Sequence, residues 1–153
     1  MAMKRSVGFY TRRTPDEMDI NQDYDLLCKE AFRGRFAEAG ETETASYYLD
    51  ICHQSDISQR PQLVRLLRNC VDGKVDIVVM DYPQRVANNM MELIFLLYFL
   101  LHLERPPEIA ILNCLSTGVS KSKKKSIMRV TEQIVSEQKS DYTHWKNRIL
   151  RGM

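Results

Sequence analysis

Short apolar runs alternate with a longer helical stripe in the first third of the chain. Ser6 to Tyr10 is an apolar run followed by polar residues, which predicts a buried strand that ends near Tyr10. From Asp19 to Ala39, apolar residues recur every three or four positions, which predicts a helix, and Gly40 supplies a stop signal. Ala45 to Leu49 predicts a second strand.

The same alternation continues through the middle of the chain. Pro61 is a typical first residue of a helix, and the apolar stripe that follows it ends at Gly73. Val75 to Met80 is rich in β-branched residues and is typical of a strand buried on both faces of a parallel sheet. Met90 to Leu103 is apolar nearly all round, which predicts a helix that is covered on several sides.

The last segments complete an α/β pattern. Ile109 to Leu112 predicts a fourth strand, and Lys123 to Arg151 predicts one long helix. Strands that alternate with helices favour right-handed crossovers and parallel pairing. We therefore expect a mainly parallel sheet of four to five strands with helices on both faces. Residues 1–120 would form this α/β domain, and residues 121–153 would form a long C-terminal helix.

Composition places the chain among globular proteins. Of its 153 residues, 44% are hydrophobic and 27% are charged, which suits one packed domain and excludes a disordered chain. The longest apolar run, Leu93 to Leu101, is too short to span a membrane, and we see no signal peptide. The four cysteines form no metal-binding or disulfide pattern, so we expect a cytoplasmic protein with free thiols.

No motif points to a cofactor. His53, His102 and His144 stand alone, without a carboxylate or a second histidine at the spacing of a metal site. Neither a P-loop nor a Gly-x-Gly-x-x-Gly motif is present. We therefore expect neither a metal nor a nucleotide cofactor.

Arginines gather in the loops that follow the expected strands. In parallel sheets, functional residues lie on loops beyond the carboxyl ends of the strands. Arg12 and Arg13 follow the first strand, Arg60 the second and Arg85 the third. The guanidinium group binds phosphate through paired hydrogen bonds, so these loops are typical of a phosphodiester site. The Thr14 hydroxyl is a candidate nucleophile, although a threonine there could equally shape the loop.

Three short segments carry a family resemblance. Tyr10 begins Tyr-Thr-Arg-Arg-Thr, Arg60 begins Arg-Pro-Gln-Leu, and Arg85 begins Arg-Val-Ala-Asn-Asn. In order and spacing, they resemble the Tyr-x-Arg-x-Ser, Arg-Pro-x-Leu and Arg-Leu-x-Arg-Asn motifs of the serine recombinases (resolvases and invertases). The resemblance runs from about Val7 to Asn113, and the expected C-terminal helix continues it.

The resemblance implies a reaction in which a serine hydroxyl attacks a DNA phosphodiester while arginines hold the phosphoryl group. No metal or cofactor is implied. Thr14 would take the nucleophile position and Asp50 the position of an acidic residue. The phosphate-binding positions would be those of Arg12, Arg60 and Arg85.

Several positions depart from the family pattern. Threonine stands in place of the nucleophilic serine, and its extra methyl restricts the side chain. Asn88 stands in place of a second arginine, Gln84 replaces an aspartate, and Gln138 falls where another arginine is usual. Because losing one donor to the reacting group typically costs about 10²- to 10³-fold in rate, we expect weak or no strand cleavage.

Two function hypotheses follow. The first is a serine-recombinase-like, DNA-associated protein of site-specific recombination, which forms a homodimer or higher oligomer through the helix Met90 to Leu103 and the distal C-terminal helix with Trp145. The alternative is a non-DNA protein interaction module on the same fold, favoured by a net charge of only +2. Duplex DNA contact is expected from basic residues of the C-terminal helix, which could equally be a solvated face: Lys123, Lys124, Lys125, Arg129, Lys146 and Arg148.

Overall fold

One sheet of five strands, in the order β2-β1-β3-β4-β5, forms the centre of the fold. The computed structural model describes residues 5–17, 43–53, 57–111, 115–116 and 121–151. The strands β1 to β4 pair in parallel, and β5 is antiparallel to β4. Their bounds are β1 Arg5–Arg13, β2 Glu43–Ile51, β3 Ile77–Met80, β4 Glu108–Ile111 and β5 Leu115–Ser116. The predicted α/β fold with a mainly parallel sheet is confirmed.

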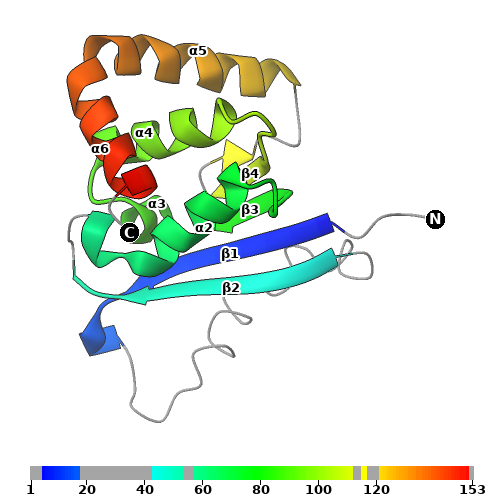
Figure 1. The fold of residues 1–153 in the computed structure, drawn as a ribbon, viewed down its shortest axis with the longest axis vertical. Coiled ribbons are helices and arrows are strands. Elements are labelled where there is room, and N and C mark those ends of the chain that lie inside the picture. The colour runs from blue at the N-terminus through cyan, green and yellow to red at the C-terminus, as the bar shows by residue number, and fades with distance from the viewer. Residues whose placement is uncertain (1–4, 18–42, 54–56, 112–114, 117–120, 152–153) are drawn as a thin grey trace.

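The described helices are stacked over one face of the sheet (Figure 1). They are α2 Pro61–Val71, α3 Pro83–Val86, α4 Met90–Leu101, α5 Lys121–Glu137 and α6 Lys139–Arg151, with short 3-10 turns η1 Pro15–Glu17 and η3 Ile57–Gln59. The predicted starts of α2 at Pro61 and of α4 at Met90 are confirmed. The helix expected from Asp19 to Ala39 lies outside the described residues.

Gly8 allows α2 to lie directly on β1. A Cβ atom at this position would lie 2.7 Å from Cδ1 of Leu66 and 3.3 Å from the ring of Tyr48. Leu66 is fully buried, so it has little room to move aside. The absence of a side chain at Gly8 therefore sets the spacing between helix and sheet.

The first two strands are longer than the sequence predicts. β1 continues past Tyr10 to Arg13, and β2 continues past Leu49 to Ile51, because the two strands pair along their whole length. Arg12 and Asp50 are consequently strand residues, placed opposite one another in the register, and not loop residues. Two expected site residues thus lie on the sheet itself.

The expectation of one long C-terminal helix is wrong in one respect: the helix is interrupted at Gln138. α5 ends at Glu137, and α6 starts at Lys139 and runs back toward α2 (Figure 1). The reversal buries Trp145, whose ring lies 6.0 Å from that of Phe95 and 5.9 Å from that of Phe99. Trp145 therefore belongs to the core of this chain and does not offer the self-association surface expected of it.

The apolar helix α4 is also covered from within the chain. Leu96 is 1% exposed and Leu100 is fully buried, with α2, α5 and α6 packed in the same core. Most of the apolar surface that motivated self-association through α4 is thus buried already, although Met90 is 68% exposed and Met91, Ile94 and Tyr98 are only partly buried, and an oligomeric state stays a prediction. No helix in the described part of the chain combines the length and apolarity needed to cross a membrane.

Candidate functional site

A hollow of about 370 Å³ lies where β1 and β3 end, and five residues line it: Arg12, Thr14, Tyr82, Gln84 and Arg85. In a sheet ordered 2-1-3-4-5, the connections from β1 and β3 leave in opposite directions, and ligands typically bind in the crevice between these strand ends. The structure therefore brings together three of the residues that the sequence predicts at a phosphate site, namely Arg12, Thr14 and Arg85.

Arg12 ties the walls of the hollow together. Its side chain is 6% exposed and donates three hydrogen bonds to backbone carbonyls. Nε donates to Arg85 (3.0 Å), Nη1 to Cys52 (3.1 Å) and Nη2 to Gln84 (2.9 Å). Since an arginine has five N–H groups, two remain for a ligand. Arg12 thus joins β1 to the segment after β2 and to α3, and these bonds limit what it offers a phosphate.

Asp81 is a second organising residue, which the sequence analysis did not single out. Its carboxylate is almost fully buried and accepts a hydrogen bond from Thr11 Oγ1 at 2.6 Å. Arg13 lies 3.4 Å from the same oxygen, and Nε of Arg85 lies 3.7 Å from it. Asp81 follows the buried run Val75 to Met80 directly, and this position was the available signal in the sequence.

Asp50 holds the start of α2. Oδ1 accepts from the backbone N–H of Gln62 and Oδ2 from that of Leu63, each at 2.9 Å. These are orphan donors of the first helical turn, where a negative charge also interacts favourably with the helix dipole. Asp50 therefore caps α2 from the neighbouring strand, and it is not among the residues that line the hollow.

The Tyr10 hydroxyl completes the bonding of Asp50. It donates to Oδ2 at 2.9 Å within the core. Burial, followed by the adjacent Asp50 charge, raises the pKa of Tyr10 well above its ordinary value. The phenol thus stays neutral and serves as a fixed donor.

Arg60 is not part of the hollow lining. Its side chain is fully buried, and Nη2 pairs with the Glu92 carboxylate at the start of α4 while Nη1 donates to the carbonyl of Val86. Its Nε has no hydrogen-bond partner within the described residues. Arg60 is therefore bound to the residue that follows Arg85 in the chain, but its guanidinium group lies in the interior.

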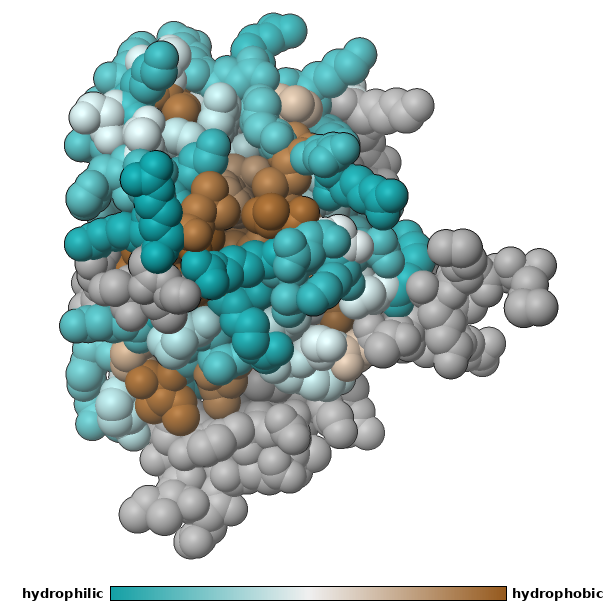
Figure 2. Space-filling view, in the orientation of Figure 1, coloured by the Kyte–Doolittle hydropathy of each residue, from teal (hydrophilic) through white to brown (hydrophobic). Residues whose placement is uncertain are grey.

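The basic residues of the C-terminal helices lie apart from the hollow. Lys123, Lys125 and Arg129 are exposed on the first half of α5. In Figure 1, α5 begins on the side of the molecule where β1 begins, opposite the end that carries the hollow. Figure 2 shows that the surface along α5 is mostly hydrophilic, with apolar side chains gathered between α5 and α2. On α6, Arg148 is exposed and Lys146 is partly exposed.

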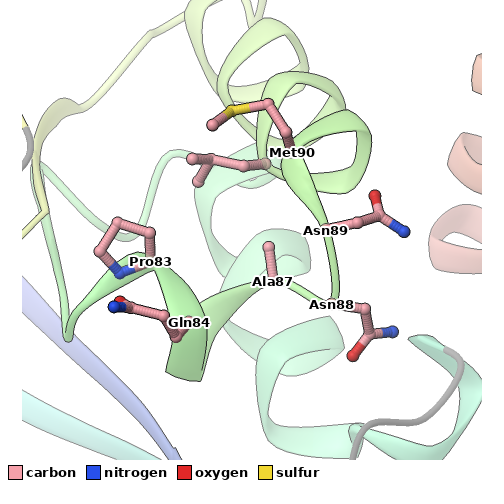
Figure 3. Close-up of a pocket in the computed structure, with 7 residues that line it drawn as sticks. Pro83, Gln84, Ala87, Asn88, Asn89 and Met90 are labelled. Atoms are coloured by element: carbon pink, nitrogen blue, oxygen red, sulfur yellow. The ribbon is translucent and has the colours of Figure 1, made fainter.

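Asn88, which replaces an arginine of the family motif, lines a different hollow of about 240 Å³. Its other walls come from α3 and the start of α4, and Met90 there is 68% exposed. Figure 3 shows Gln84 and Asn88 on either side of Ala87. Gln84 lines both hollows, whereas Asn88 lines only this one and Thr14 only the other.

The described residues contain no group of three histidine, cysteine or acidic side chains that could hold a metal ion. Lys124 is partly exposed and Thr14 is half-buried. The side chains of the residues that line the first hollow include two guanidinium groups, one hydroxyl, one amide and one phenol.

Comparison with known proteins supports the fold. No family model matches the chain, and no curated protein matches it in sequence. The N-terminal catalytic domain of TP901-1 integrase superposes with a TM-score of 0.57 at 18% identity, over 89% of this chain and 98% of the other. The C-terminal catalytic domain of ISC1926 TnpA, an IS607-like serine recombinase, gives a TM-score of 0.49 at 17% identity, over 86% and 82%. The chain has the fold of the catalytic domain of TP901-1 integrase.

Proposed function

We propose that this chain is a DNA-associated domain of the serine recombinase type with weak or no strand-cleaving activity. One observation carries the proposal. Thr14 shares a hollow with Arg12 and Arg85 at the switch point of the sheet, while Arg60 is buried against Glu92. A hydroxyl beside guanidinium groups suits a phosphodiester. Because Arg60 is buried and paired with Glu92, it would not stabilise the reacting phosphoryl group.

The reaction itself would need more positive charge than the hollow provides. Oγ1 of Thr14 would lose its proton and form a bond to phosphorus, while the bond to the 3′ oxygen breaks and that oxygen takes up a proton. Positive groups aimed at the phosphoryl oxygens stabilise such a transition state. Arg12 already serves three carbonyls, and Arg85 shares the Asp81 carboxylate with Arg13. Cleavage is therefore expected to be slow even where DNA is bound.

Duplex DNA is the proposed partner of the basic residues on α5 and α6. Lysines contact phosphates as point charges and release counterions, so such binding weakens steeply as salt rises. The lysines of α5 and the hollow lie at opposite ends of the domain. A duplex bound to α5 would therefore contact the lysines through its phosphate backbone and would not enter the hollow. This arrangement favours association with DNA over cleavage.

A salt series with a labelled duplex tests the proposal. The full chain is expected to bind at low salt, and the logarithm of its association constant should fall linearly with the logarithm of the salt concentration. Changing Lys123, Lys124 and Lys125 together to Gln should reduce the slope by about 0.9 for each phosphate that the variant no longer neutralises. The matched control is Arg5→Gln, Lys74→Gln and Arg105→Gln, which removes the same charge from exposed positions outside α5 and α6. Absence of binding at the lowest salt would favour the protein interaction module.

A further inference from the structure

Tyr82 is the most exposed of the tryptophan, tyrosine and phenylalanine residues in the described part of the chain. It is 40% exposed, and the other exposed large hydrophobic residues of that part are all aliphatic. The remaining described tryptophan, tyrosine and phenylalanine side chains lie in the core or against it. Burying an aromatic ring is strongly favourable, so a ligand that covers the exposed part of Tyr82 would gain free energy.

The surroundings of Tyr82 are those of the hollow. Tyr82 lines it together with Arg12, Thr14, Gln84 and Arg85. Guanidinium groups bind phosphate oxygens, an aromatic face stacks on a nucleobase, and a glutamine amide hydrogen-bonds to base edges. These groups are the complement of one nucleotide, with its phosphate near the arginines and its base on the ring.

The backbone of Tyr82 is held on both sides of the residue. The Tyr82 N–H donates to Oδ1 of Asp81 at 2.8 Å, and its carbonyl accepts from the N–H of Arg85 at 2.8 Å. Pro83 follows and restricts Tyr82 to extended conformations, in agreement with φ −51° and ψ 147°. Binding would therefore cost little further backbone entropy at Tyr82.

From these observations, and resting on the proposed function, we propose that Tyr82 stacks on an unpaired base whose phosphate occupies the hollow. In the interior of a duplex both faces of each base are covered by neighbouring bases. Away from the duplex ends, the ring can therefore stack only on a base that has left the helix or lies in a single strand. The hollow therefore selects single-stranded or locally opened DNA, in contrast to the lysines of α5, which contact the backbone of any duplex.

The experiment measures the affinity of the full chain for a labelled single-stranded thymidine oligomer and for a labelled blunt duplex. Tyr82→Ala should weaken single-strand binding by about 5- to 150-fold, the range for one base stacked on an aromatic ring. Tyr82→Phe, which keeps the ring, should bind like the wild type, and Tyr82→Leu should bind like the alanine variant. Duplex affinity should be the same in all four proteins, and urea midpoints identify any variant that folds poorly.

Three outcomes would overturn the inference. Equal single-strand affinity in wild type and Tyr82→Ala, or an equal reduction for single strand and duplex, means that the ring does not stack on an unpaired base. Competition by thymidine monophosphate as strong as that by the oligomer means that a free nucleotide, and not a strand, occupies the hollow. If duplex binding persists in these cases, the proposed DNA association is kept and only the stacking by Tyr82 is rejected. If the wild type binds no DNA of either kind, both proposals are rejected.

Discussion

The Glu92 carboxylate accepts a hydrogen bond from the fully buried guanidinium group of Arg60. The same carboxylate oxygen lies 3.3 Å from the backbone N–H of Asn88, which donates to it. The N–H of Glu92 in turn donates to Oδ1 of Asn89, the residue that caps α4. Arg60 is therefore bound to the first turn of α4, and its charge is neutralised within the protein and not by a ligand.

Removing Glu92 should destabilise the fold. Glu92→Ala leaves the buried Arg60 charge without its counter-ion, and we expect a decrease of about 3 to 5 kcal/mol in the free energy of unfolding. The paired change Arg60→Leu with Glu92→Leu removes both charges and should be less destabilising than Glu92→Ala alone. Urea denaturation of the three proteins provides the test. A Glu92→Ala variant as stable as the wild type would show that Arg60 has no such partner in solution.

Asp50 should behave as a structural cap. Asp50→Ala removes the acceptor for two backbone N–H groups and the Tyr10 hydroxyl, and it should cost about 2 to 4 kcal/mol in the free energy of unfolding. Asp50→Asn keeps one acceptor oxygen and should cost less. The control is Asp72→Asn, at an exposed acid after α2, which should leave the urea midpoint unchanged. An Asp50→Ala protein with normal stability would contradict the capping role.

Alkaline pH should remove the contribution of Tyr10. Burial first, and then the Asp50 charge, raise the pKa of Tyr10 in the folded state well above 10.0. Below pH 10 the phenol is neutral in the folded and unfolded chains, and its hydrogen bond contributes fully, by about 1 kcal/mol. As pH rises toward the folded-state pKa, the unfolded chain ionises first and this contribution disappears.

The comparison with Tyr10→Phe isolates this effect, because the other tyrosines titrate in both proteins. The wild type should be the more stable protein at pH 8, and its advantage should shrink as the pH is raised above 10. Urea midpoints across this range provide the measurement. A difference that does not change with pH would contradict the assignment.

Cys70 should resist alkylation in the folded protein. Burial raises the pKa of its thiol from 9.0 to about 12, so the reactive thiolate is scarce at pH 8. Cys52 is partly exposed and serves as the internal comparison. Peptide mass spectrometry after iodoacetamide treatment should show Cys52 modified well before Cys70, and urea should remove the difference. Equal rates without urea would mean that Cys70 is accessible in the folded state.

Restoring one catalytic group should not restore cleavage. Thr14→Ser supplies the family's nucleophile, but Arg60 stays paired and position 88 still lacks an arginine. Catalytic groups that act together are not additive, so Thr14→Ser alone should give little covalent protein–DNA adduct. Thr14→Ser with Asn88→Arg should give more, and Thr14→Ala should give none. The assay uses supercoiled DNA with a family recombination site and a fused DNA-reading domain. Abundant adduct from the unmodified chain would contradict the proposal of impaired catalysis.

Local patterns predict much of the fold. The β-branched run before Asp81 and the proline at position 61 identify a central strand and the start of a helix, because burial and the fixed φ of proline are local properties. The interruption at Gln138 has no comparable signal, since neither glycine nor proline lies nearby. It follows from the packing of Trp145 against α4, a contact between residues far apart in the sequence.

The candidate site was predictable in position but not in bonding. Strand ends and arginines in the sequence identify the edge that carries Arg12, Thr14 and Arg85. That Arg60 faces Glu92, 32 residues away, depends on how α2 and α4 pack, which no local pattern contains. The exposure of Tyr82 could not be predicted for the same reason. Whether a tyrosine after a strand is buried or exposed depends on the elements that pack around it.

The return of α6 to the body of the domain also affects how the chain opens. Arg68 on α2 donates to the carbonyls of Ile149 and Leu150, the last turn of α6, at 2.8 and 3.2 Å. With Trp145 and Ile149 in the common core, α6 cannot detach without exposing the centre of the protein. We therefore expect the C-terminal helix and the sheet to unfold as one cooperative unit, with the amide hydrogens in the middle of α6 exchanging through the same global opening as those of the sheet.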